Sequence, residues 1–171
     1  MNIIFLDIDG VLNMYGSSSR TFMKPYGQHI EPHIVQRLNY ICEKVHNLNI
    51  VISSSWRSDM DDLKLQLEEQ GFKYWDLVID KTCQPKLISS NQPPYNLETD
   101  YVCMHRGQQI AEWLHRHQFK GNFLVIDDEI QDICGTTCSN IDRDYVYEID
   151  LNEGLLHKDA IAIIEYFKDN K

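Results

Sequence analysis

A short apolar run at the start of the chain ends in two acids, and this pattern already limits the fold to a few classes. Residues 2–6 form the run, Asp7 and Asp9 are the acids, and Gly10 follows them. The run predicts a strand buried on both faces, as in a parallel sheet. Open α/β sheets bind ligands at the carboxyl ends of such strands, and residues two apart share a face. Two carboxylates this close repel each other unless a cation lies between them, and Mg²⁺ prefers such oxygen ligands.

A second apolar run repeats the pattern near the end of the chain. Residues 122–126 are followed by Asp127, Asp128 and Glu129. Two strands that bring carboxylates to one sheet edge predict a divalent metal site. Asp132 is near enough in sequence to join this site, or it simply begins the following turn. Solvated acids at a strand end are the plainer alternative, because short motifs also occur by chance, but the repetition favours the metal site.

Strand and helix patterns alternate along the whole chain. This alternation predicts an α/β fold with a Rossmann-like parallel sheet and helices on both faces. The expected strands are residues 2–6, 48–52, 74–79, 122–126 and 145–149, and the expected helices are residues 31–47, 59–70, 106–117 and 155–167. Two stretches lack a periodic pattern, and loops of this length are often functional. We therefore predict a flap over the site at residues 13–30 and a substrate wall at residues 80–100, with plain surface loops as the alternative.

A serine-rich turn follows the strand predicted at residues 48–52. A hydroxyl at a strand end can donate to a phosphate oxygen, and so can the free amides of a turn. The serines can equally cap the next helix. We expect Ser53 or Ser54 to bind the ligand and Ser58 to cap the helix. Arg57 either reaches the site or pairs with a surface acid.

Arg106 is expected at the start of a helix, where a positive charge is unfavourable for the helix itself. This placement favours another role, such as holding a phosphate or neutralising the acids. An exposed arginine without a task is the alternative. Arg20 and Lys24, in the predicted flap, are further possible phosphate contacts.

Composition sets wider limits on the function. The chain has 171 residues, of which 43% are hydrophobic, as expected for one globular domain with a full core. A net charge of −10 argues against a general polyanion binder, although a local basic patch remains compatible with it. The scattered cysteines favour reduced thiols. There is no apolar run that could span a bilayer and no secretory signal pattern, so we expect a cytoplasmic protein.

These residues together resemble the motifs of the haloacid dehalogenase (HAD) superfamily of phosphohydrolases. Residues 7–12 resemble its first motif, and Ser53 stands at the hydroxyl of the second. Arg106 resembles the cation of the third motif, and Asp127 and Asp128 resemble the acids of the fourth. The similarity spans residues 3 to about 129. The short intervals between the motifs imply a capless member of the superfamily.

A narrower resemblance points to a branch of the superfamily that is associated with RNA repair proteins. It rests on residues 54–57, on the helix that begins at Arg106 and on residues 153–155. One departure concerns the third motif, whose cation is often lysine. Lys86 is therefore the alternative to Arg106 as the phosphate-binding cation.

The resemblance implies a mechanism. Asp7 would attack phosphorus and form an aspartyl-phosphate, while Asp9 would protonate the leaving alcohol and later activate water. Mg²⁺ would be held by Asp7, the backbone carbonyl of Asp9 and Asp127, with Asp128 in or just behind the coordination shell. An acid at the position of Asp9 accompanies phosphatases in this superfamily. The side chains implied to hold the phosphate oxygens are Ser53, Ser54 and Arg106.

The motifs and the composition do not select one substrate. A capless site suits a bulky substrate, either a phosphoprotein or a nucleic-acid end. The narrower resemblance favours nucleic acid, whereas the net charge of −10 favours a phosphoprotein or a small metabolite or nucleotide. The alternative of another class is a non-catalytic phosphate- or metal-binding module. The oligomeric state is not predicted.

Overall fold

The centre of the protein is a five-stranded parallel sheet, seen in a computed structural model that describes residues 1–14, 29–83, 105–134 and 141–170. Its strands are β1 (Asn2–Leu6), β2 (Leu48–Ile52), β3 (Val78–Lys81), β4 (Asn122–Asp127) and β5 (Val146–Glu148). They lie in the order β3-β2-β1-β4-β5. β1 is therefore central and pairs on both sides, which explains why all its residues after Asn2 are apolar and buried.

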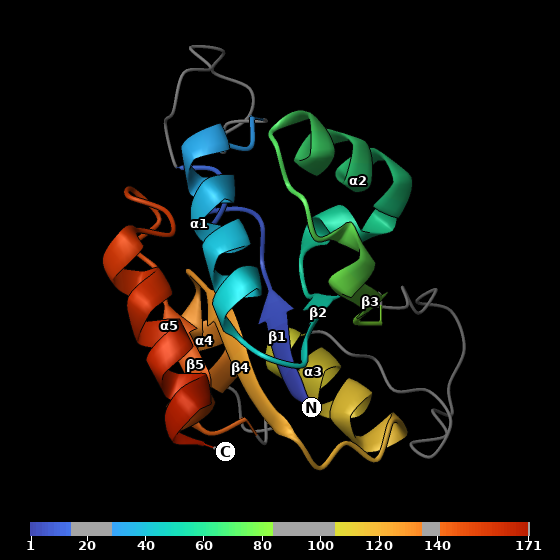
Figure 1. Cartoon of the computed structure of the whole chain (residues 1–171). Coiled ribbons are helices and arrows are strands. Elements are labelled where there is room, and N and C mark those ends of the chain that lie inside the picture. Colours follow the sequence, from blue (N-terminus) through green and yellow to red (C-terminus); the bar gives the residue numbers. More distant parts are fainter. Residues whose placement is uncertain (15–28, 84–104, 135–140, 171) are drawn as a thin grey trace, which may run out of the picture.

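Helices cover both faces of this sheet (Figure 1). The helices are α1 (Pro32–Lys44), α2 (Met60–Glu69), α3 (Arg106–Arg116), α4 (Ile130–Cys134) and α5 (His157–Asp169). Buried residues of α1, α2 and α5 share one core with Ile4 and Leu6 of β1. Ile3 and Phe5 face the other way and pack against residues of α3 and α4. The prediction of a Rossmann-like α/β fold with two helical layers is confirmed.

The ends of some elements differ from the prediction. β3 begins only at Val78, because a 3-10 turn, η2 (Trp75–Leu77), comes before it. α4 is a short helix that the sequence did not predict. Asp59, not Ser58, caps α2, since its side chain accepts a hydrogen bond of 3.0 Å from the backbone N–H of Asp62. The residues directly before Asp59 form another 3-10 turn, η1 (Ser55–Ser58).

The residues that the structure describes form the sheet and its covering helices, without a large cap domain. Residues 15–28 and 84–104 lie outside the described part of the chain. The predicted flap at 13–30 and substrate wall at 80–100 fall mostly within these stretches and stay predictions. Among the residues that the structure describes, no helix has the length and apolar character needed to cross a bilayer.

Candidate active site

Strand register brings three predicted site residues side by side. The last residue of β1 pairs directly with the last residue of β2 and with Ile126 of β4. The next residues along these strands, Asp7, Ser53 and Asp127, therefore meet at one edge of the sheet. Backbone hydrogen bonds continue this alignment, since the N–H of Asp7 donates to Ile126 O at 3.0 Å. The edge lies between β1 and β4, where the strand order reverses, and α/β folds bind ligands at this point.

Three carboxylates cluster at this edge around a single arginine. Asp7, Asp127 and Asp128 each offer one oxygen, and the three oxygens lie within 4.8 Å of one another. Asp7 and Asp127 are only 2% and 1% exposed. Arg106 Nη1 lies 2.6 Å from Asp7 Oδ2 and 2.5 Å from Asp127 Oδ2. The structure thus brings the predicted cation of α3 onto the acids of β1 and β4.

The electrostatics of the cluster favour a further cation. Burial raises the pKa of Asp7, and burial together with the charge of Asp7 raises the pKa of Asp127 to about 8 and that of Asp128 to about 6. Burial alone would lower the pKa of Arg106, but the carboxylates of Asp7 and Asp127 raise it overall. Asp7 Oδ1 is buried without a hydrogen-bond partner among the residues that the structure describes. This all-oxygen donor set, negatively charged in excess, fits a hard divalent metal such as Mg²⁺.

Asp9 is held by side chains that sequence reasoning did not assign to the site. Trp56 Nε1 and Asn13 Nδ2 each donate to Asp9 Oδ1 at 2.9 Å, and Ser55 Oγ donates to Oδ2 at 3.3 Å. Asn13 Oδ1 in turn accepts a 2.9 Å bond from the N–H of Gly10. The carboxylate of Asp9 therefore has a fixed orientation. Only the tight spacing of Asn13 after Asp9 hinted at this in the sequence.

Gly10 lets the loop after β1 pass close to Asp128, which follows β4. Its φ is +70°, and a Cβ added there would lie 2.3 Å from Asp128 Oδ2. We expect Gly10→Ala to lower the free energy of unfolding by about 1–3 kcal/mol and to displace Asp128. Urea denaturation measures the first effect, and a weaker affinity for Mg²⁺ reports the second.

Gly71→Ala is the matched control for this substitution. Gly71 also has a positive φ, +91°, but an added Cβ there would meet nothing within 4 Å. It should cost only the backbone strain, about 1 kcal/mol, and leave metal affinity unchanged. Equal effects of the two substitutions would mean that the approach to Asp128 is unimportant.

The serine-rich turn supplies two buried hydroxyls. Ser53 is fully buried, and its Oγ has no hydrogen-bond partner among the described residues, so it is available as a donor. Ser54 caps η1, since its side chain accepts a hydrogen bond from the backbone N–H of Trp56. Arg57 is not a surface residue, and among the described residues no surface acid pairs with it. It is buried, donates to the carbonyl of Ser54 and donates to Gln109 Oε1 of α3 at 2.8 Å, and so ties the turn to α3.

Asp132 does not join the acid cluster. It lies 3.0 Å from His105 Nδ1 and accepts a 3.1 Å bond from the backbone N–H of Arg106. A carboxylate at a helix N-terminus is favourable, so Asp132 offsets the charge of Arg106 there. Lys86, the alternative cation, and the flap residues Arg20 and Lys24 lie outside the described residues.

Comparison with known protein families gives one match. The model of the family described as "HAD domain in Swiss Army Knife RNA repair proteins" matches residues 3–160. The chain belongs to this family. It is a HAD-type hydrolase domain, and both the superfamily and the narrower branch predicted from the motifs are confirmed. No curated protein matches the chain.

Proposed function

We propose that this HAD domain is a Mg²⁺-dependent phosphatase that hydrolyses a phosphomonoester through an aspartyl-phosphate. The observation that carries this proposal is the pair of acids in the first loop. Asp7 is buried against Arg106 with one oxygen unpartnered among the described residues, while Asp9 is oriented by three donors. A nucleophile and a separately positioned acid–base group are what a two-step displacement at phosphorus needs.

The two carboxylates have distinct tasks. Asp7 Oδ1 attacks phosphorus, the bond to the leaving oxygen breaks, and Asp9 gives that oxygen a proton. Asp9 then takes a proton from a water molecule, which attacks phosphorus, releases phosphate and restores Asp7. The free hydroxyl of Ser53 and the guanidinium of Arg106 hold the phosphoryl oxygens, because both donate beside the nucleophile.

The proposed metal site is the cluster of two buried acids and one half-buried acid. Asp7, Asp127 and Asp128, with the backbone carbonyl of Asp9, would hold Mg²⁺. The bound ion would supply positive charge that offsets both the phosphate and the acids.

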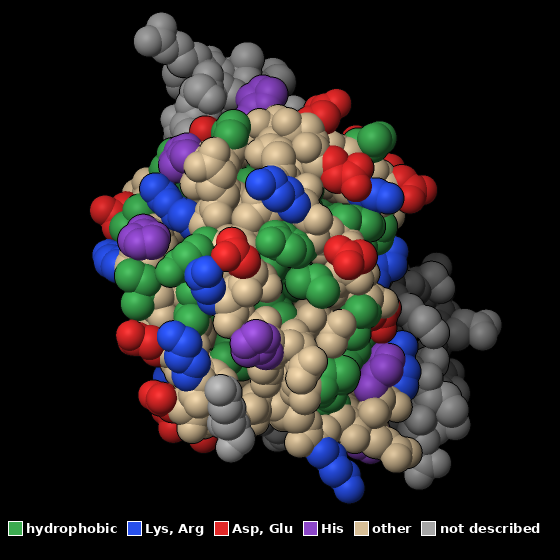
Figure 2. All heavy atoms as spheres, viewed as in Figure 1, with side chains coloured by type: hydrophobic (Ala, Val, Ile, Leu, Met, Phe, Trp, Pro, Cys, Tyr) green, Lys and Arg blue, Asp and Glu red, His purple; other side chains and the backbone are tan. Residues whose placement is uncertain are grey.

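The family supports a nucleic-acid substrate. Its description names RNA repair proteins, so we propose a phosphate at a nucleic-acid end as the substrate. A phosphoprotein is the second candidate, favoured by the net charge of −10. On the face drawn in Figure 2, basic and acidic side chains are interspersed, without a broad basic surface for a long polyanion. Recognition of a strand end, rather than of a long duplex, is compatible with this distribution.

Hydrolysis of a small aryl phosphate with and without metal tests the proposal. We expect turnover with Mg²⁺, a loss of about 100-fold or more with EDTA, and recovery with excess Mg²⁺, because metal charge stabilisation is worth several kcal/mol. Turnover that ignores EDTA would contradict the metal role. If aryl phosphate, phosphopeptides and phosphorylated oligonucleotides all resisted hydrolysis while Mg²⁺ still bound, the non-catalytic binding module would be the correct function.

A further inference from the structure

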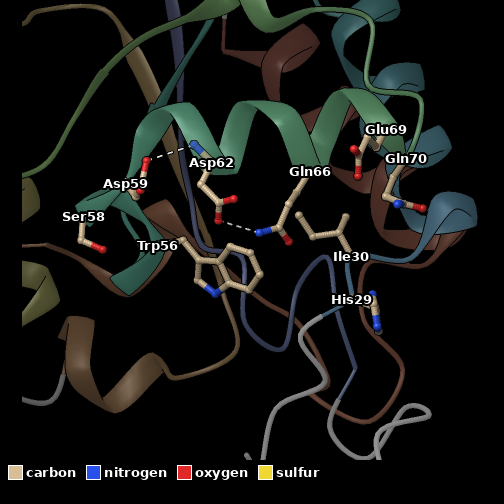
Figure 3. Close-up of a pocket in the computed structure, with 9 residues that line it drawn as sticks. All are labelled: His29, Ile30, Trp56, Ser58, Asp59, Asp62, Gln66, Glu69 and Gln70. Carbon is tan, nitrogen blue, oxygen red and sulfur yellow. Dashed lines mark hydrogen bonds between the residues drawn. The ribbon is translucent and has the colours of Figure 1, made fainter.

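A groove of about 470 Å³ lies between η1, α2 and the residues that lead into α1, and Trp56 is part of its lining. Figure 3 shows the ring of Trp56 beneath α2, with Asp62 and Gln66 above it and Ile30 across from it. Asp59, the N-cap of α2, and Glu69, at the other end of this helix, also line the groove. Its size is that of a small-molecule site.

Trp56 joins this groove to the proposed chemistry. Its ring lines the groove, and its Nε1 donates to Asp9 Oδ1 at 2.9 Å. In the proposed function, on which this inference rests, Asp9 protonates the leaving oxygen. The leaving oxygen then lies next to Asp9. Because Trp56 contacts Asp9 and also lines the groove, the rest of the leaving group can occupy the groove.

The lining of the groove decides which leaving group fits. Three of its residues are acids, Asp59, Asp62 and Glu69, and none of the groove residues that the structure describes is lysine or arginine. Acidic side chains also gather around α2 on the face in Figure 2. A further phosphate in the groove would be repelled. A flat, uncharged group that stacks on the indole and donates N–H groups to carboxylates would be accommodated.

We propose that the groove binds the nucleobase of the phosphorylated terminal nucleotide of a single strand. Bases of single strands are commonly recognised by stacking on aromatic side chains and by hydrogen bonds to their edges. Trp56 supplies the aromatic surface, and Asp62 and Gln66, which hydrogen-bond to each other at 2.7 Å, supply adjacent acceptor and amide groups. The rest of the strand, with its phosphates, leaves the acidic groove toward solvent.

Two matched pairs of oligonucleotides test this inference. Every strand carries a terminal phosphate, at the 3′ end in one pair and at the 5′ end in the other, and one member of each pair lacks the terminal base. We expect the base-bearing strand of the pair that is hydrolysed to have a kcat/KM about 10-fold higher, mostly through KM, as stacking on an aromatic ring allows. Asp62→Asn should reduce this ratio several-fold, because the variant loses a negatively charged acceptor in the groove.

Asp61→Asn is the control, since Asp61 shares the first turn of α2 but does not line the groove. Asp61→Asn should keep the wild-type ratio of kcat/KM between base-bearing and abasic strands. Equal rates on base-bearing and abasic strands would overturn the base site and leave the phosphatase intact. Preference for a lysine-flanked phosphopeptide over both strands would overturn it in favour of a basic peptide. Failure on every substrate, aryl phosphate included, would overturn the proposed function together with this inference.

Discussion

Asp7→Asn should lower kcat on an aryl phosphate by about 10³-fold or more, because an amide cannot attack phosphorus. The same change should leave the metal-free protein at least as stable as the wild type. Asp7 is buried beside Asp127 and Asp128. Burial raises the pKa of all three carboxyl groups, and the charge of Asp7 raises the pKa of Asp127 and of Asp128 further. Removing one charge relieves the repulsion. Phosphate release assays and thermal unfolding in EDTA measure the two effects.

A loss of activity without a loss of stability would distinguish a lost nucleophile from a damaged fold. A general folding defect would lower both activity and the melting temperature. Asp76→Asn, which removes an exposed carboxylate elsewhere on the surface, should change neither. Mg²⁺ should raise the melting temperature of the wild type more than that of Asp7→Asn, since the variant has lost a metal ligand. Activity of Asp7→Asn within ten-fold of the wild type would exclude Asp7 as the nucleophile.

Arg106→Ala should destabilise the metal-free protein by about 3–5 kcal/mol, the usual cost of removing one partner from a buried ion pair. The Nη1 of Arg106 contacts both Asp7 and Asp127, and the arginine side chain is 18% exposed. Its loss leaves the clustered acids without this cation. Urea denaturation measures the loss, and Mg²⁺ should recover part of it because the ion offsets the same charges. Hydrolysis should fall by at least about 100-fold, as for other lost transition-state donors.

Arg106→Lys separates the charge of the side chain from its geometry, and Arg116→Ala is a control on the same helix. Arg106→Lys keeps the charge but not the planar fork, so we expect an intermediate loss of both stability and activity. Arg116→Ala, on the exposed side of the same helix, removes only a surface pair with Glu112 and should cost less than about 1 kcal/mol. If Arg106→Ala cost no more than Arg116→Ala, the buried acids would not depend on Arg106.

The family match agrees with the HAD resemblance that was predicted from Asp7 and the residues after it. The apolar runs before Asp7 and Asp127 are strands β1 and β4, and they are adjacent and parallel. Parallel pairing brings the residues after each strand to one edge, so the acids had to meet there once both runs were strands. Arg106 was predictable for another reason. A cation in the first turn of a helix is unfavourable locally, and the contacts with Asp7 and Asp127 offset this cost.

The side-chain partners of the site were not predictable in the same way. Arg57 bonds to Gln109, Trp56 bonds to Asp9, and Asp132 turns to the start of α3 rather than to the acids. Each of these contacts joins segments more than 20 residues apart, and no local rule of spacing specifies it.

The sequence by itself therefore determined the strands, the α/β fold with helices on both faces of the sheet, and the sheet edge that carries the acids. Apolar runs and the helical and strand periods are patterns of neighbouring residues, so they can be read from the sequence. The tertiary structure alone decided which donors hold Asp9, that Gly10 must lack a Cβ to pass Asp128, and that a groove adjoins Trp56. Those features arise where η1, α2 and the first loop pack together, and packing depends on the whole chain at once.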